Sequence, residues 1–141
     1  MKFMCVYAVL LLTAATTQAS TMVETTVFDR GEGGYYGFRI PAVVQAQNGT
    51  ILAFAEARKN SNSDFGDIDL VVKRSVDGGL TWSPLQIINN NGTSESGNPA
   101  PVVDQVTGNI ILPFVKDRQI PWVTTSTNGG LTWTTPVDIS A

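Results

Sequence analysis

The chain has 141 residues and a formal net charge of −3, with 43% hydrophobic and 15% charged residues. Those values fit a folded globular protein, and the lack of a basic stripe excludes nucleic-acid binding. The sequence has no histidine and one cysteine, Cys5, which excludes Ser-His-Asp and Cys-His catalysis and histidine-bound zinc within this chain. Any chemistry must use carboxylates, arginines, hydroxyls or a partner segment.

The first segment is typical of a secretory leader. Lys2 supplies a positive charge, residues 6–15 are apolar, and Ala19 ends a run with small residues. We expect a signal peptide over residues 1–19, a secreted protein (or one in the lumen of a secretory or lysosomal compartment), and no membrane span once the leader is removed. The alternative, a transmembrane anchor, is disfavoured because the apolar run is short for a bilayer.

Four short runs of apolar or alternating residues follow, and no convincing helix is present. The runs cover residues 40–46, 50–58, 67–74 and 81–88, and Gly, Asn, Asp and Pro residues separate them. Residues 47–49 and 75–79 are hairpin signals between the first and the last pair. Asn48 and Asn91 each begin an Asn-Gly-Thr sequon, which is a glycosylation acceptor or simply a tight turn.

This unit of four runs then recurs later in the sequence. The segment SVDGGLTW at residues 75–82 returns as STNGGLTW at residues 126–133, an offset of 126 − 75 = 51 residues. Residues 41–44 and 51–54 have similar counterparts at 101–103 and 111–114. A four-strand unit that repeats every 40 to 50 residues or so is typical of a β-propeller blade. The sequence therefore predicts an all-β propeller fold, with about two blades in residues 20–141.

Antiparallel topology assigns the polar residues to two ends of the first blade. Arg39 at the start of the first strand, Arg58 at the end of the second and Asp64 in the loop that follows share one end. That loop is about nine residues longer than its counterpart in the second blade, and long loops within compact repeats are commonly functional.

The repeated turn lies at the opposite end. Its Asp or Asn can accept hydrogen bonds within the turn, its glycines supply positive φ and its tryptophan can pack between strands. We therefore assign a structural role, rather than a catalytic one, to Ser75, Asp77, Gly79 and Trp82 and to their counterparts Ser126, Asn128, Gly130 and Trp133.

These motifs resemble those of the sialidase family. Phe38-Arg39-Ile40-Pro41 is similar to the Phe-Arg-Ile-Pro motif of sialidases, residues 75–82 and 126–133 look like two Asp boxes (BNR repeats), and residues 53–58 and 97–101 resemble neighbouring segments. The resemblance implies a six-bladed propeller, of which this chain is the amino-terminal part. It also implies an exo-α-sialidase that hydrolyses terminal α-linked sialic acid with retention. Sialylated glycoproteins, glycolipids and oligosaccharides would be its partners, with no cofactor and no metal.

The resemblance also implies roles for the three residues at the first end. Arg39 would be the first of three arginines that grip the sugar carboxylate, since a planar guanidinium binds a carboxylate bidentately; a surface salt bridge is the alternative. Arg58 would contact the sugar or hold the acid/base, and Asp64 would be the acid/base. A free Asp titrates near 3.9, so protonation of the leaving group requires the site to raise its pKa. Asp67 and Asp69 compete for this role, but their alternation with Ile68 and Leu70 places them on one strand face, where we expect them to be solvated.

The catalytic Tyr and Glu and the other two arginines of the family are expected in later blades. We therefore expect residues 20–141 alone to be inactive and poorly folded. Two alternatives remain: a non-catalytic Asp-box propeller that binds carbohydrate, and a trans-sialidase that transfers sialic acid to a sugar acceptor. A downstream Tyr, Glu and two arginines would separate the enzyme from the binding module.

Overall fold

The structure is a computed structural model that describes residues 22–140, so the expected leader lies outside the described residues. The described part is built from strands, which confirms the all-β prediction. Its elements are a 3-10 turn η1 (Glu32–Gly34) and the strands β1 (Gly37–Gln45), β2 (Ile51–Arg58), β3 (Ile68–Ser75), β4 (Gln86–Asn89), β5 (Ser96–Gly97), β6 (Val102–Val103), β7 (Ile110–Lys116), β8 (Ile120–Ser126) and β9 (Val137–Asp138).

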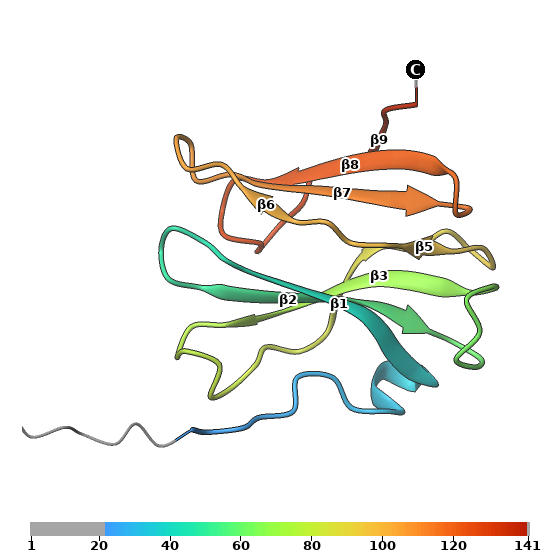
Figure 1. Cartoon of the computed structure of the whole chain (residues 1–141), viewed down its shortest axis with the longest axis horizontal. Coiled ribbons are helices and arrows are strands. Elements are labelled where there is room, and N and C mark those ends of the chain that lie inside the picture. The colour runs from blue at the N-terminus through green and yellow to red at the C-terminus, as the bar shows by residue number, and fades with distance from the viewer. Residues whose placement is uncertain (1–21, 141) are drawn as a thin grey trace, which may run out of the picture.

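The strands form two antiparallel sheets that lie one above the other (Figure 1). The first sheet has the order β1-β2-β3-β4. In the second sheet, β7 pairs with both β5 and β6 along one edge and with β8 along the other, and β9 is outermost. Neither sheet closes on itself, and the arrangement fits two successive blades of a propeller.

Two strand boundaries differ from the sequence prediction by more than one residue. β1 begins at Gly37, three residues early, so Arg39 lies within the strand and pairs with Glu56. β4 begins only at Gln86, because Pro84 has no N–H to donate to a ladder and residues 77–81 are held in their own turn.

The apolar core lies between the two sheets. Leu52 and Phe54 alternate along β2 and pack against Ile110, Leu112 and Phe114 of β7. The intervening alanines of β2 point to the opposite face, because successive side chains of a strand alternate. There they pack under the segment that precedes β1, with Tyr35, Ala55, Ala57 and Val71 buried and Phe28 and Phe38 beside them. Both faces of β2 are therefore covered, which explains its nearly continuous apolar sequence.

The first strand of each sheet, at one edge, is interrupted at a proline. In β1 the pairing with β2 shifts between Arg39 and Ala42, and in the second sheet residues 98–101 separate β5 from β6. Pro41 stands in the first break and Pro99 in the second, and neither can donate a ladder hydrogen bond. The residue before each proline has a left-handed backbone, with φ of 53° at Ile40 and 54° at Asn98.

The two copies of the repeated turn share their internal hydrogen bonds. In the first copy, Gly79 N donates to Ser75 Oγ at 2.8 Å and Thr81 N donates to Asp77 Oδ1 at 3.0 Å. In the second copy, the amides of residues 130 and 132 make the same bonds to Ser126 Oγ and Asn128 Oδ1, at 2.8 and 3.0 Å. Side-chain and backbone hydrogen bonds from Thr81 lower the pKa of Asp77 to about 2.

The second turn also packs against the first sheet. Arg74 Nε donates to Gly129 O at 2.8 Å, and a Cβ on Gly130 would clash with the end of the Leu52 side chain. The ring of Trp133 meets that of Phe54 edge-on at a centroid distance of 5.8 Å. The first turn is contacted instead by the segment before β1, where Thr25 Oγ1 donates to Gly79 O at 2.7 Å. The second turn thus contributes to the inter-sheet core.

Two further observations concern residues 22–140 alone. No helix among them has the length and apolar character needed to cross a membrane. No group of three or more potential metal-ligating side chains occurs among them either.

Candidate functional site

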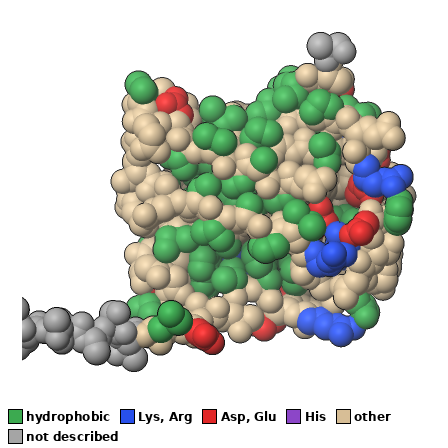
Figure 2. Space-filling model, viewed as in Figure 1, with side chains coloured by type: hydrophobic (Ala, Val, Ile, Leu, Met, Phe, Trp, Pro, Cys, Tyr) green, Lys and Arg blue, Asp and Glu red, His purple; other side chains and the backbone are tan. Residues whose placement is uncertain are grey.

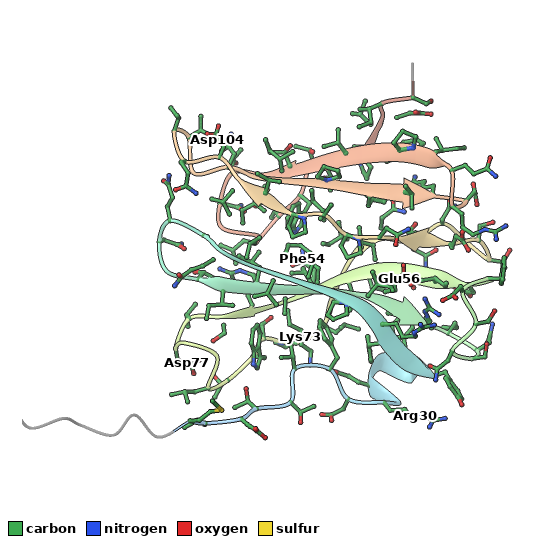
Figure 3. All side chains as sticks on the ribbon, viewed as in Figure 1. Arg30, Phe54, Glu56, Lys73, Asp77 and Asp104 are labelled. Atoms are coloured by element: carbon green, nitrogen blue, oxygen red, sulfur yellow. The ribbon has the colours of Figure 1, made fainter. Side chains whose placement is uncertain are left out.

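The inward face of β2 changes character along its length. Leu52 and Phe54 belong to the core, whereas Glu56 and Arg58 continue the same alternation and place two charges at the end of the strand. Figure 3 shows Phe54 in the middle of the molecule, Glu56 toward one end and Asp77 at the other. The two ends that the sequence predicts are therefore far apart in space.

A cavity of about 300 Å³ lies at the charged end, between the two sheets. Six charged side chains contribute to its wall, from both sheets: Arg39, Glu56, Arg58, Asp64, Glu95 and Arg118. Figure 2 shows acidic and basic side chains gathered on this side of the molecule, beside a surface that is largely apolar or neutral. The structure thus brings Arg39, Arg58 and Asp64 together, as the topology predicts.

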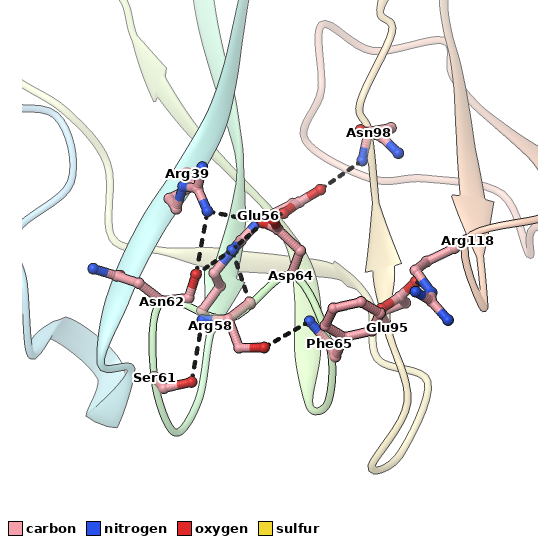
Figure 4. Close-up of polar contacts among 11 residues, drawn as sticks. Arg39, Glu56, Arg58, Ser61, Asn62, Asp64, Phe65, Glu95, Asn98 and Arg118 are labelled. Carbon is pink, nitrogen blue, oxygen red and sulfur yellow. Dashed lines mark hydrogen bonds and ion pairs between the residues drawn. The ribbon is translucent and has the colours of Figure 1, made fainter.

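Arg58 holds the loop that carries Asp64 (Figure 4). Its side chain is only 2% exposed, and its Nη1 donates to Asn62 O at 2.6 Å, to Ser63 O at 2.8 Å and to Asp64 Oδ1 at 2.6 Å. Burial alone would lower the pKa of Arg58, but the hydrogen bonds to Glu56 and Asp64 outweigh it and raise the pKa. These contacts favour the loop-holding role over direct contact with a ligand.

Glu56 is a site residue that the sequence analysis missed. It is 5% exposed, accepts from Arg58 Nη2 at 2.5 Å and accepts from the Asn98 backbone N–H at 3.0 Å. A Cβ on Gly97 would lie 3.0 Å from Glu56 Cδ and would clash with its Oε1, so only glycine allows this approach. Its position two residues before Arg58, on the same strand face, was the available signal.

Arg39 reaches the cavity from β1. Its side chain is 45% exposed, and its Nη1 donates to Asn62 O at 3.2 Å and to Asp64 Oδ1 at 2.8 Å. Its exposed side chain contrasts with the enclosed one of Arg58, so Arg39 is the better placed of the two to bind a ligand.

Asp64 is 65% exposed, and a single oxygen, Oδ1, contacts both Arg39 and Arg58. The hydrogen bond from Arg58, with the charge of Arg39, lowers the pKa of Asp64 below its ordinary value. A proton donor needs the opposite shift. Asp64 is therefore ionised in this arrangement, and two guanidinium groups meet one carboxylate at the cavity wall.

Asp69 does not lie where the sequence analysis expected it. It is 1% exposed rather than solvated, because Tyr35 covers it and donates from Oη to Asp69 Oδ2 at 2.5 Å. Burial raises the pKa of Asp69. Asp69 pairs with Ala57 and so faces away from Glu56 and Arg58, which removes it as a rival to Asp64 in the cavity. Asp67, just before β3, is partly exposed and is not part of the cavity wall.

The second sheet supplies a further pair that the sequence analysis missed. Arg118, in the turn between β7 and β8, contacts Glu95 with an Nε–Oε1 distance of 3.0 Å. The Arg118 guanidinium also lies over the ring of Phe65, with Cζ 4.2 Å from the ring centroid. The loop that carries Asp64 is thus contacted from both sheets.

No protein-family model matches the chain. Curated relatives do. The chain is similar to an exo-alpha-sialidase of Arthroderma benhamiae, with 38% identity over 138 residues, covering 76% of this chain and 34% of that protein. An exo-alpha-sialidase of Aspergillus fumigatus is 37% identical over 139 residues with the same coverage. The chain spans about a third of the length of these relatives.

Solved structures of sialidases are also similar to the chain. A Hadza microbial sialidase matches with a TM-score of 0.72 and 26% identity, covering 78% of this chain and 27% of that one. A Trypanosoma rangeli sialidase in complex with sialic acid matches with a TM-score of 0.62 and 23% identity, covering 74% of this chain and 20% of that one, and this likeness concerns the fold.

Proposed function

This chain belongs to the sialidase family, and we propose that it forms part of the substrate site of an exo-α-sialidase that releases terminal α-linked sialic acid with retention. Sialylated glycoproteins, glycolipids and oligosaccharides would be the substrates. The leader expected over residues 1–19 supports action outside the cytoplasm, on glycans of that kind.

The observation that carries the proposal is the pair of arginines at the cavity wall. Arg39 and Arg58 place Nη atoms 2.8 and 2.6 Å from one oxygen of the Asp64 carboxylate, and Arg39, the exposed member of the pair, is the one that can exchange this partner for a ligand carboxylate. Sialic acid differs from neutral sugars in carrying a carboxylate on its ring. A guanidinium recognises that group with two parallel N–H donors, which a neutral sugar cannot match.

Substrate binding would also change the state of Asp64. A substrate carboxylate on Arg39 would replace Asp64 there. The hydrogen bond from Arg58, which is the largest cause of the lowered pKa of Asp64, remains, but the loss of Arg39 and the nearby negative charge of the substrate both raise that pKa from its lowered value. Asp64 could then carry a proton and donate it to the glycosidic oxygen as the bond to the sugar breaks. Its ionised form would accept a proton from the water that attacks in the second step of a retaining reaction.

The test replaces Arg39 with lysine in the complete protein that carries this chain. Lysine keeps the charge but cannot make two parallel hydrogen bonds, and one charge-assisted hydrogen bond contributes about 1.5–3 kcal/mol. We expect Arg39→Lys to lower kcat/KM for an aryl α-sialoside by about ten- to a hundredfold.

The matched control is Arg30→Lys, because Arg30 is also exposed but stacks on Tyr36 at 4.1 Å and does not line the cavity. Near-normal turnover by Arg39→Lys would overturn the proposal. Saturable binding of the sialoside by the wild type without any turnover would favour a carbohydrate-binding module, and transfer to a sugar acceptor in place of water would indicate a trans-sialidase.

A further inference from the structure

The contact between the two sheets at Phe65 has no part in the function proposed above. Phe65 directly follows Asp64, and its ring is 63% exposed even though the Arg118 guanidinium lies over it at 4.2 Å. Arg118 belongs to the second sheet, whereas Phe65 belongs to the loop between β2 and β3. The contact therefore joins the turn of one sheet to the loop of the other, one residue from Asp64.

The turn that presents Arg118 is firmly held. Its two central residues, Asp117 and Arg118, both have positive φ, 49° and 61°, which is the hairpin geometry that matches the twist of the strands. Asp117 N donates to Glu95 O at 3.1 Å, and Asn91 Nδ2 donates to Asp117 Oδ1 at 3.2 Å. The Glu95 carboxylate, which is nearly buried, lies 3.0 Å from Arg118 Nε. Arg118 is thus directed toward Phe65 by its own turn and by Glu95.

The loop itself has few other attachments. Residues 59–66 are all exposed, and the base of the loop is held by Lys59, which contacts Asp67 and Tyr36 through its backbone. Beyond Lys59, the loop is tied by Arg58 to residues 62–64, by Arg39 to Asn62 and Asp64, and by Arg118 to Phe65. A ligand carboxylate that takes Arg39 removes one of these ties. Arg58 and Arg118 then remain to keep Asp64 beside the cavity.

We propose that Arg118, held by Glu95, is a positioning residue that acts through Phe65 to keep Asp64 at the cavity while substrate is bound. This inference rests on the proposed function, because it assumes that Asp64 transfers the proton. Arg118 borders the cavity, but its guanidinium contacts Glu95 and the Phe65 ring, so we assign its effect to the loop rather than to the sugar. Its removal therefore affects the reactions that depend on Asp64 and spares those that do not.

The test uses the complete protein and two substrates. Sialyllactose has a sugar leaving group that needs protonation, whereas an aryl α-sialoside with an acidic phenol needs little. A cation–π contact at an exposed site corresponds to about a two- to fivefold effect on an equilibrium. We expect Arg118→Ala to lower kcat for sialyllactose by about that factor and to leave the aryl sialoside within about twofold of the wild type.

A second readout does not depend on activity. Hydrogen exchange of the Phe65 amide, which donates to Ser63 Oγ at 3.1 Å, should accelerate in Arg118→Ala and in Phe65→Leu. The matched control is Arg30→Ala, which removes a similar arginine–aromatic stack at 4.1 Å away from the loop and should leave both readouts unchanged. Adding Arg118→Ala to Phe65→Leu should lower kcat for sialyllactose no further, because both substitutions break the same contact between the guanidinium and the ring.

The outcomes separate the two proposals. Equal losses for both substrates, or unchanged exchange at Phe65, would overturn the positioning role of Arg118. If Asp64→Ala itself slows both substrates equally, Asp64 is not the proton donor and the proposed function is the part that fails. Exchange at Phe65 then still decides whether Arg118 holds the loop.

Discussion

The first strands of the two sheets are interrupted at corresponding points, but the residues at the two interruptions differ. The first break reads Arg39-Ile40-Pro41 and the second reads Gly97-Asn98-Pro99. The middle residues, Ile40 and Asn98, both have a left-handed backbone conformation, with φ of 53° and 54°. Asparagine tolerates that conformation, whereas a β-branched isoleucine adopts it at a cost. The second break follows local preference, while the first is imposed by its surroundings, directly beside an arginine of the cavity. Backbone strain of this kind concentrates at functional sites.

The largest effect is expected at the second break, from Gly97→Ala. The new Cβ would clash with the Glu56 carboxylate and displace it from Arg58. Overpacking of this kind costs about 1–3 kcal/mol, and we expect the free energy of unfolding in urea to fall by that amount and activity to fall with it. Gly37→Ala is the matched control in β1, since its Cβ would meet only the tip of the exposed Asn62 side chain, at 3.1 Å. Equal losses for the two variants would show that Glu56 is free to move.

A smaller effect of opposite sign is expected at the first break. Ile40→Asn would give the first strand the residue type that the second one uses, and Ile40 is partly exposed, so little burial is lost. Relief of the left-handed isoleucine should raise the free energy of unfolding by about 1 kcal/mol, measured by denaturant titration. Asn98→Ile should lower it by a similar amount. Destabilisation by Ile40→Asn would mean that the isoleucine side chain contributes more through packing than its backbone costs.

The smallest effect is expected at the repeated turns, where Asp77→Asn makes the first copy match Asn128 of the second. The pKa of Asp77 is lowered to about 2 when folded, against an ordinary value near 4. Its ionised form therefore adds stability above about pH 4, and this contribution disappears as the pH falls through about 2. Melting temperatures of the wild type and Asp77→Asn should differ slightly at pH 6 and converge near pH 2. If the two melting temperatures still differ at pH 2, the charge of Asp77 is not the cause of the difference in stability.

The sequence predicted the parts of the site that depend on one sheet. Strand alternation and antiparallel topology were enough to place Arg39, Arg58 and Asp64 at one end, because these rules act within a single blade. The burial of Asp69 was not predictable in this way, since it depends on Tyr35, which lies before the first strand.

The contributions of the second sheet were also beyond the sequence patterns. From the second sheet, the Asn98 backbone N–H donates to the Glu56 carboxylate and Gly97 lies against it, and the turn after β7 presents Arg118 to Phe65. Such contacts join residues far apart in the chain, and their identity depends on how two blades pack rather than on any local pattern. Because these contacts join residues that are far apart in the sequence, the wall of the cavity was harder to predict than the fold.

The packing of the second turn on the first sheet also sets an order of events during synthesis. The four strands of the first sheet are complete at Asn89, but the surface formed by Leu52 and Phe54 is covered in part when β7 has been made and fully only when Gly130 and Trp133 have left the ribosome. Until then a nascent chain exposes an apolar face of the kind that chaperones bind and that promotes aggregation. A premature stop codon between these two points would therefore release a sheet whose strands can all pair but whose core stays open, and quality control would remove it.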